Sequence, residues 1–279
     1  MKLHHTLLLG IALFAAASCS EVDESNRFDG PYTVEAKKNV LVEDFTGQTC
    51  TNCPLANDEM VNILSNYGTD RVIAVSLHGG SNSLREDGNK YGLANVQGYT
   101  YISQLGINSF PKGRIDRQGD FIDYDKWDAE IFKRFSNDYN IQLSIDNNAT
   151  SFNLADSTLT VKVNVENQGS TSITGKLQVW LTESNIVGPQ YQTDGKIDMN
   201  YTHNHVFRHS VNDFEGEQIT LNASSTESKT YSYTFPGVAN IKNKTPWQPA
   251  NMHYVVIFYN EGNGVMQVIE RGLLKAEAE

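Results

Sequence analysis

The chain has 279 residues, with 22 Lys and Arg against 33 Asp and Glu, which gives a formal net charge of −11. This length suits two domains of moderate size, because a single core rarely keeps growing beyond about 250 residues. The acidic balance argues against nucleic acid as a partner, since phosphate binding needs a concentrated basic surface and the short basic clusters here supply none.

Residues 1–18 have the pattern of an export signal. Lys2 gives a basic start, residues 7–17 are almost wholly apolar, and small residues stand directly before Cys19. This apolar run is much shorter than the roughly 20 residues that a membrane-spanning helix needs. Residues 16–19, Ala-Ala-Ser-Cys, resemble the lipobox of bacterial lipoproteins, which implies cleavage before Cys19 and a lipid anchor on its thiol. The alternative is an ordinary secretory signal, and either one predicts export.

Residues 19–35 are expected to form a tether. The acidic stretch at residues 20–25 resembles the export signal that some Gram-negative bacteria place behind the lipidated cysteine of surface-exposed lipoproteins. The same composition also suits any solvated linker, because it cannot bury enough apolar surface to fold. The expected location is therefore the cell envelope, as an outer membrane lipoprotein that is exposed at the cell surface if the acidic stretch acts as a signal.

Cys50 and Cys53 are the two cysteines that remain once Cys19 is acylated. In an exported protein their thiols can be oxidised, so they can pair with each other or bind something together. Residues 39–45 predict a buried strand, residues 46–49 a loop, and the apolar spacing after Cys53 a helix. Cys50 would then lie at a helix N-terminus, where free amide groups and the helix dipole lower the pKa of a thiol.

This order of strand, Cys-x-x-Cys and helix, followed by a strand at residues 71–78, resembles the thioredoxin superfamily. The resemblance implies that Asp44, six residues before Cys50, is the buried acid that helps to move the proton of Cys53. It also implies that Pro111 is a cis-proline facing the cysteine pair, whereas an ordinary loop proline is the alternative. The chain departs from the usual pattern in having Thr and Asn between the cysteines and no Trp before Cys50.

More specifically, residues 42–54 look like the signature of the Omp twenty-eight family of outer membrane lipoproteins. Residues 201–208, Tyr-Thr-His-Asn-His-Val-Phe-Arg, look like the histidine-containing stretch of that family. The resemblance covers most of the mature chain and implies a thioredoxin-like domain joined to a β-rich C-terminal domain. For function it implies an outer membrane location and a surface or receptor role.

The second half of the chain, from about residue 139, predicts strands throughout. Residues 141–145, 159–165 and 177–181 alternate apolar and polar side chains, and four more short strands fit the region after residue 217. About seven such strands suggest an immunoglobulin-like sandwich. The expected fold is thus an α/β thioredoxin-like domain at residues 36–138, with a helical insertion at about 80–106, followed by an all-β sandwich at residues 139–279.

A long connection at about residues 183–215 is the most unusual part of this second domain. If residues 203–209 were extended, His203, His205 and His209 would share one face, which is a possible zinc arrangement. We favour the alternative that these histidines hydrogen-bond the connection to its surroundings. No metal and no cofactor are therefore expected.

Three roles remain open for Cys50 and Cys53: thiol-disulfide exchange, a structural disulfide, or metal binding with further ligands close in space. The first role predicts an oxidoreductase that acts on envelope proteins, with protein thiols or disulfides as partners. In it Cys50 attacks, Cys53 resolves the mixed disulfide, Asp44 moves a proton and Pro111 presents backbone to the substrate. The alternative is a surface binding or adhesion lipoprotein with an unknown envelope or host ligand. In both, Cys19 attaches the chain to the membrane.

Overall fold

Strands dominate the part of the chain that the structure describes, residues 38–87, 89–236 and 246–274. In this computed structural model fourteen strands accompany three α-helices over those residues. The expected signal at residues 1–18, Cys19 and the tether to residue 35 lie outside the described residues. Of the helices that are described, none is long and apolar enough to cross a membrane.

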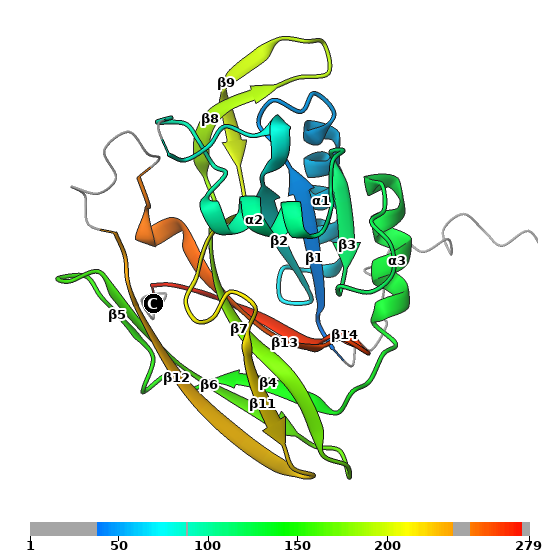
Figure 1. Ribbon diagram of the computed structural model, residues 1–279, viewed down its shortest axis with the longest axis vertical. Coiled ribbons are helices and arrows are strands. Elements are labelled where there is room, and N and C mark those ends of the chain that lie inside the picture. The colour runs from blue at the N-terminus through cyan, green and yellow to red at the C-terminus, as the bar shows by residue number, and fades with distance from the viewer. Residues whose placement is uncertain (1–37, 88, 237–245, 275–279) are drawn as a thin grey trace, which may run out of the picture. The chain divides into compact units, whose positions relative to one another are not determined.

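A mixed sheet of eight strands contains segments from both halves of the chain (Figure 1). β1 and β2 are parallel, as are β2 and β10, and the remaining neighbours are antiparallel. The order across the sheet is β14 (Gly264–Gly272), β13 (Met252–Asn260), β7 (Ile173–Glu183), β10 (Val206–Ser210), β2 (Val72–His78), β1 (Val40–Thr46) and β3 (Lys112–Ile115), with β11 (Glu217–Leu221) beside β7.

Helices cover both faces of the sheet around β1 and β2. α1 (Cys53–Tyr67) and α3 (Trp127–Arg134) pack on one face, whereas α2 (Val96–Gln104) packs on the other (Figure 1). Successive residues of a strand point to opposite faces, so Val40 and Val42 meet α1 and α3 while Leu41 contributes to the core on the side of α2. Burial on both faces explains why all seven residues of β1 are buried.

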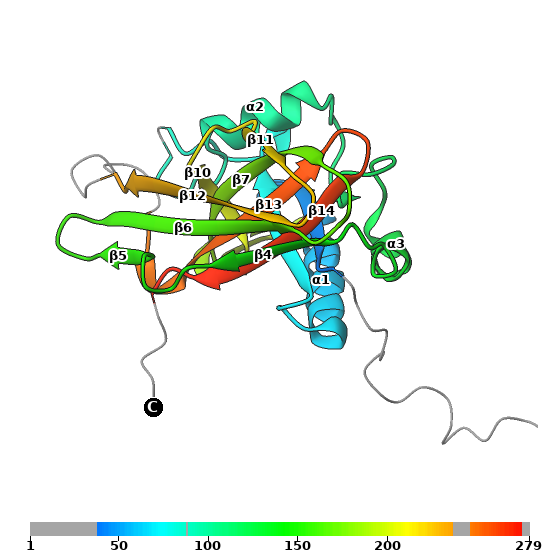
Figure 2. The same cartoon turned by 90° about the horizontal axis from the view of Figure 1, so that it is seen from below.

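A second, smaller sheet packs against β7 and β13 (Figure 2). It is formed by β12 (Ser225–Thr234), β6 (Thr158–Asn167), β4 (Ile141–Ile145) and β5 (Ser151–Asn153). The inward side chains of β6 alternate with half-buried or exposed ones, which is the pattern of a strand with one face on a core. The core between the two sheets is apolar, with Leu159, Val163 and Phe258 fully buried.

β8 (Ile186–Tyr191) and β9 (Ile197–His203) form a separate two-stranded hairpin. Together with β10 they occupy most of the segment that was expected as a long connection at about residues 183–215. The hairpin lies at the end of the sheet where β1 leads into α1 (Figure 1). This places it over the loop that carries the two cysteines.

The predicted fold class, a thioredoxin-like α/β domain followed by a separate immunoglobulin-like sandwich, is wrong. β10 joins β2 through the pairing of Val206 with Ser76, and the amide of Ser76 donates to the carbonyl oxygen of His205 at 2.8 Å. Trp180 and Phe207 pack in the same core as Leu41, Phe45 and Ile73, among others.

The two halves therefore share one mostly β structure with a mixed sheet, and no clear thioredoxin-like domain stands apart in the described residues. The second layer is sandwich-like, but it packs on strands of that shared sheet. The physical reason for the error lies in the edge of β2. Its unpaired N–H and C=O groups need a partner strand, and local periodicity cannot say which distant strand supplies them.

Candidate functional site

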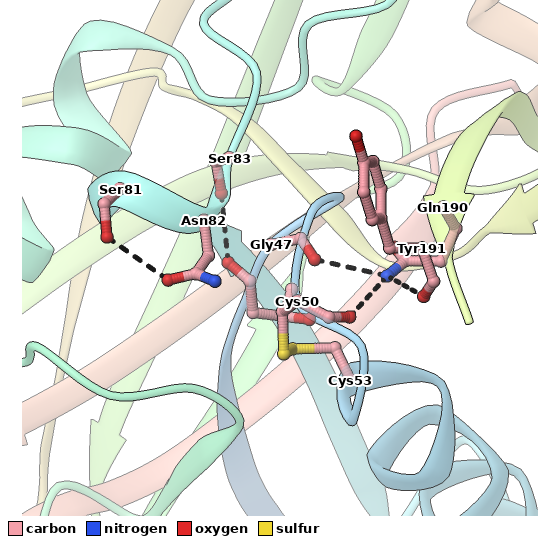
Figure 3. The surroundings of a disulfide bond; sticks show 9 residues. Gly47, Cys50, Cys53, Ser81, Asn82, Ser83, Gln190 and Tyr191 are labelled. Carbon is pink, nitrogen blue, oxygen red and sulfur yellow. Dashed lines mark hydrogen bonds between the residues drawn. A yellow bond between two sulfur atoms is a disulfide. The ribbon is translucent and has the colours of Figure 1, made fainter. Parts of the chain in front are cut away.

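Cys50 and Cys53 form a disulfide at the start of α1 (Figure 3). Their Cα atoms are 5.4 Å apart. β1 ends at Thr46, the amide of Cys50 donates to the carbonyl oxygen of Gly47 at 3.1 Å to close the turn, and α1 begins at Cys53. Pro54 occupies the first turn of α1, where a missing N–H leaves no helical hydrogen bond unmade. The strand, loop and helix follow the order that the sequence predicts.

The β8–β9 hairpin covers this loop through hydrogen bonds to its backbone. The side-chain amide Nε2 of Gln190 donates to the carbonyl oxygens of Cys50 at 2.9 Å and of Gly47 at 3.3 Å (Figure 3). The amide of Tyr191 donates to the carbonyl oxygen of Gln48 at 2.9 Å. Both cysteines are only 4% exposed. A protein thiol can therefore reach either sulfur only after part of this cover moves.

A second segment holds the loop from the opposite side. The amide of Thr49 donates to the carbonyl oxygen of Asn82 at 2.9 Å, and the hydroxyl of Ser83 donates to the carbonyl oxygen of Thr46 at 3.2 Å. A Cβ atom on Gly47 would lie 2.2 Å from the carbonyl oxygen of Asn82, so glycine is required by this close approach of two backbones. The disulfide loop is thus fixed on two sides.

Asp44 shares a small cavity with Cys53. The cavity has a volume of about 20 Å³, which is room for roughly one water molecule. Asp44 pairs with Ser76 across β1 and β2, and the Ser76 hydroxyl donates to its Oδ2 at 3.4 Å. Its other oxygen, Oδ1, is buried and has no hydrogen-bond partner among the described residues. Burial raises the pKa of Asp44 to about 7, against a small opposing effect of the Ser76 hydrogen bond.

Two histidines line the same cavity, His78 from the end of β2 and His203 from the end of β9. Their ring centroids are 5.6 Å apart in an edge-to-face arrangement. Burial lowers the pKa of both, that of His203 to about 4, and the neighbouring His203 further lowers that of His78. Both are therefore neutral at pH 7. His78 Nδ1 and His203 Nε2 are buried without a hydrogen-bond partner in the described residues.

The three histidines that the sequence placed on one face do not meet. His205 has a φ of 56°, a left-handed conformation that separates β9 from β10, and burial lowers its pKa to about 4. His209 instead stacks on Tyr233, with ring centroids 4.4 Å apart. Among the residues that the structure describes, no group of three or more His, Cys, Asp and Glu is arranged to hold a metal ion.

Pro111 directly precedes β3, and the peptide bond between Phe110 and Pro111 is cis. The next residue, Lys112, pairs with Phe45 near the end of β1, so Pro111 lies at the same end of the sheet as the cysteine loop. It is buried, but it does not line the cavity of Asp44 and Cys53. Cys19, the expected lipidation site, is outside the described residues.

The structure places Asp44 and Cys53 at one cavity, together with two further residues, His78 and Gln190, that the sequence does not predict. His78 is the last residue of a predicted strand, and no role in the site was predicted for it. Gln190 lies in the segment that was expected as a long connection. The one available signal for His78 was a polar residue that directly follows a buried apolar run, Val-Ile-Ala-Val-Ser-Leu. Nothing local could have placed Gln190 over the loop of Cys50.

Residues 98–275 match the family model described as Outer membrane protein Omp28. The chain belongs to the Omp28 family. The family resemblance that the sequence suggested is thereby confirmed, and with it an association with the outer membrane. The matched segment runs from α2 to the end of β14 and does not include the loop of Cys50 and Cys53. No curated protein sequence matches the chain.

Among solved structures, HBP35 of Porphyromonas gingivalis is similar to this chain with a TM-score of 0.63 at 16% sequence identity. The alignment covers 86% of this chain and 77% of that one, and at this identity it shows a shared fold alone. Beta-glucuronidase 2 of Bacteroides uniformis aligns over 47% of this chain and 12% of its own, with 14% identity and a TM-score of 0.24. Spo0M of Bacillus subtilis aligns over 47% and 46%, with 12% identity and a TM-score of 0.31. Neither of these two weaker likenesses bears on function.

Proposed function

We propose that this outer membrane protein exchanges disulfides with thiols of other envelope proteins through Cys50 and Cys53, and that a lipid on Cys19 anchors it. Starting from the disulfide, a substrate thiolate attacks the sulfur of Cys50 and breaks the Cys50–Cys53 bond. Cys53 leaves as a thiolate and takes a proton from Asp44. A second substrate thiolate then attacks the substrate sulfur of the mixed disulfide, and Cys50 leaves as a thiolate. The substrate is oxidised to a disulfide and the pair is reduced to a dithiol; the reverse sequence reduces a substrate disulfide.

The observation that carries this proposal is the position of Asp44. Its carboxyl group shares a cavity of about 20 Å³ with Cys53, and its pKa of about 7 lets it give or take a proton near neutral pH. Burying a carboxyl group with one oxygen unpaired is unfavourable, so a purely structural disulfide gives no reason for this residue. A proton-transfer role supplies one. Cys50 attacks and Cys53 resolves because Cys53 is the sulfur beside the acid.

A second candidate function is a surface binding protein in which the disulfide only fixes the loop. The low exposure of both cysteines, 4% each, favours it. So do the hydrogen bonds from Gln190, since they tie the hairpin to the loop in a closed arrangement. In that case the β-rich part of the molecule would bind the partner.

Trapping of mixed disulfides in cells distinguishes the two functions. Cys53→Ser keeps the attacking thiol of Cys50 but cannot resolve the mixed disulfide, so envelope proteins should accumulate on it as adducts that dithiothreitol releases. Cys50→Ser is the matched control, because its remaining thiol, Cys53, faces the cavity of Asp44 and serves as the resolving group, so it should trap far less. Equal and negligible trapping by both full-length variants would leave the structural role as the explanation.

A further inference from the structure

A second cavity, of about 330 Å³, lies where α2, the turn after β3, β7 and the turn between β13 and β14 come together. Its volume falls within the range of small-molecule sites, roughly 300 to 1,000 Å³. Three cationic side chains and three aromatic rings form the part of its lining that matters here: Arg114, Arg117, Lys176, Tyr101, Phe214 and Tyr259. Such a group of cations is unexpected in a chain with a net charge of −11.

Arg117 lies deep in this wall, with a side chain only 7% exposed. Its Nε donates to Glu43 Oε1 at 2.9 Å, and its Nη1 donates to Gln178 Oε1 at 2.7 Å. Its third nitrogen, Nη2, is buried and has no hydrogen-bond partner among the described residues. The guanidinium therefore keeps one unused donor in the wall of the cavity.

The backbone holds Arg117 in an unfavourable conformation. Asp116 and Arg117 have φ values of 51° and 56°, and the amide of Gln118 donates to the carbonyl oxygen of Ile115 at 3.0 Å to close the turn. These are the two central positions of a tight hairpin turn, where Asn and Gly are the usual residues and a long side chain is not. Asp116 is occupied by an ion pair with Lys38, so its placement has a structural reason. Arg117 likewise pairs with Glu43 and Gln178, and the turn places its guanidinium at the wall of the cavity.

The other two cations also have hydrogen-bond donors without a partner among the described residues. Arg114 Nε is buried without a hydrogen-bond partner in the described part of the chain, and its guanidinium carbon lies 5.4 Å from the ring centroid of Phe121. The side chain of Lys176 is half-buried and has neither an ion pair nor a hydrogen bond with any described residue. Both side chains line the cavity, and the ammonium group of Lys176 is unpaired there within the described ranges.

Acidic groups next to the cavity cancel only part of this charge. Glu43 is fully buried and is already paired with Arg117 and with the hydroxyl of Tyr101. Glu215 and Glu261 also line the cavity, but both are exposed residues at its outer edge. The inner wall is thus left with Arg114, Lys176 and the free nitrogen of Arg117.

The aromatic rings provide an apolar wall next to these donors. The guanidinium of Arg117 lies 4.5 Å from the ring centroid of Tyr259 and 5.9 Å from that of Tyr101. The rings of Tyr101 and Phe214 meet edge to face at 5.6 Å. A ligand that places a negative group on the cations can therefore lay an apolar or ring-bearing body against these side chains.

We propose that this cavity binds a small organic oxyanion, a carboxylate or a phosphate ester, with an apolar or ring-bearing body. The oxyanion contacts Arg114, Lys176 and Nη2 of Arg117, because arginine presents donors in a geometry that fits two oxygens of such a group. The body lies against Tyr101, Phe214 and Tyr259. This site is separate from the disulfide and does not depend on the proposed exchange activity.

Calorimetric titration of the full chain with benzoate, phenyl phosphate, benzyl alcohol and inorganic phosphate tests the proposal. Benzoate or phenyl phosphate should bind, and whichever binds tighter identifies the carboxylate or the phosphate as the preferred group. Lys176→Gln and Arg114→Gln should each weaken that binding about tenfold, because each removes a charge-assisted hydrogen bond. Lys196→Gln, which removes a lysine that is 83% exposed on the hairpin, should not change it.

Replacing Cys50 and Cys53 together by Ser should also leave this affinity unchanged, which separates the cavity from the redox site. Arg117 is not suitable as a test, because its loss would leave Glu43 buried without its cation. Thermal unfolding of each variant checks that it folds. The proposal is overturned if neither anion binds, if benzyl alcohol or inorganic phosphate binds as tightly as the aromatic anions, or if folded Lys176→Gln and Arg114→Gln variants bind like the unaltered chain.

Discussion

Two buried regions of the molecule are made of opposite kinds of side chain. Between the two sheets, strand β6 and its neighbours contribute aliphatic and aromatic residues that pack against one another, such as Val163 and Phe258. Around Asp44, in contrast, three buried polar atoms lack hydrogen-bond partners in the described residues: Asp44 Oδ1, His78 Nδ1 and His203 Nε2. The first region lowers the free energy of the folded state, whereas the second raises it.

The apolar core between the sheets therefore stabilises the fold, whereas the unpaired polar groups around Asp44 belong to the candidate site. Unpaired polar atoms persist only where the rest of the structure stabilises them, and they gather where chemistry needs them. Truncating a core side chain should therefore destabilise the fold, whereas removing the charge of the unpaired Asp44 should stabilise it. Four changes test the core and the surroundings of the site, beginning with the largest.

Phe258→Ala should cause the greatest loss of stability. Phe258 is fully buried in the core between the sheets, and removing a buried phenyl ring typically costs about 3 to 5 kcal/mol in the free energy of unfolding. Urea unfolding followed by circular dichroism measures this. Met199→Ala is the control, because Met199 is 50% exposed on the hairpin and should change stability by less than about 0.5 kcal/mol. Equal effects of the two changes would show that the packing between the sheets does not dominate stability.

Asp44→Asn should instead stabilise the oxidised protein at high pH. The pKa of Asp44 is about 7 in the folded chain against an ordinary 3.8, so between these values the unfolded chain releases a proton that the folded chain retains. Asp44 therefore makes stability fall as pH rises from about 4 to 7. At pH 8 the variant should be more stable by on the order of 3 kcal/mol, and at pH 4 the two should be nearly equal.

Urea unfolding at both pH values, with the disulfide intact, gives the comparison for Asp44. Other buried carboxyl groups, such as Glu183 and Glu270, have pKa values raised to about 7 as well, but they are present in both proteins and cancel in the difference. An unchanged slope of stability with pH would contradict the assignment of a raised pKa to Asp44.

Gly47→Ala should disturb the cysteine loop. The added Cβ would lie 2.2 Å from the carbonyl oxygen of Asn82, so one of the two backbones must shift at a cost of about 2 kcal/mol in unfolding free energy. Gly262→Ala is the matched control, since its Cβ would meet no atom closer than 3.8 Å. Thermal unfolding of both variants decides the matter, and a tolerated Gly47→Ala would mean that the loop is less tightly held than its contacts suggest.

Gln190→Ala should have the smallest effect on stability but a clear one on access. It removes the hydrogen bonds to the carbonyl oxygens of Cys50 and Gly47, which favours the open hairpin by about 1 kcal/mol. Reduction of the disulfide by dithiothreitol should then become about fivefold faster. Gln142→Ala, a change at an exposed position of β4, should leave the rate unaltered. No acceleration would show that the hairpin does not limit access.

Much of the fold follows from local sequence pattern. Residues 39–45 and 71–78 were predicted as strands because they are mostly apolar runs, and β1 and β2 lie within one residue of these bounds. β6 was predicted because its apolar side chains alternate. β8 was not predicted as a strand because it contains Gly188 and Pro189, which usually interrupt strands. β9 was not predicted because it is mostly polar and exposed. The joining of β10 to β2 could not be read from any local pattern.

The site divides in the same way. Cys50, Cys53 and Asp44 were found because their spacing along one strand, loop and helix is local. His78 and Gln190 were missed because their role depends on contacts between segments far apart in the sequence. The predicted extension from His203 to His209 failed at His205, whose left-handed conformation bends the chain away. The turn that places Arg117 at its cavity could not be predicted from the sequence either, since Arg is not a residue that predicts such a turn.

The equilibrium reduction potential of the Cys50–Cys53 pair tests the central claim most directly. It is measured on the full chain in detergent by labelling free thiols across buffers of defined thiol-to-disulfide ratio. The Cys50→Ser variant gives the extent to which Cys53 is labelled when it cannot form the disulfide. Thiol-disulfide exchange predicts a potential between about −120 and −270 mV. A potential below about −300 mV would contradict it and mark the pair as a structural disulfide.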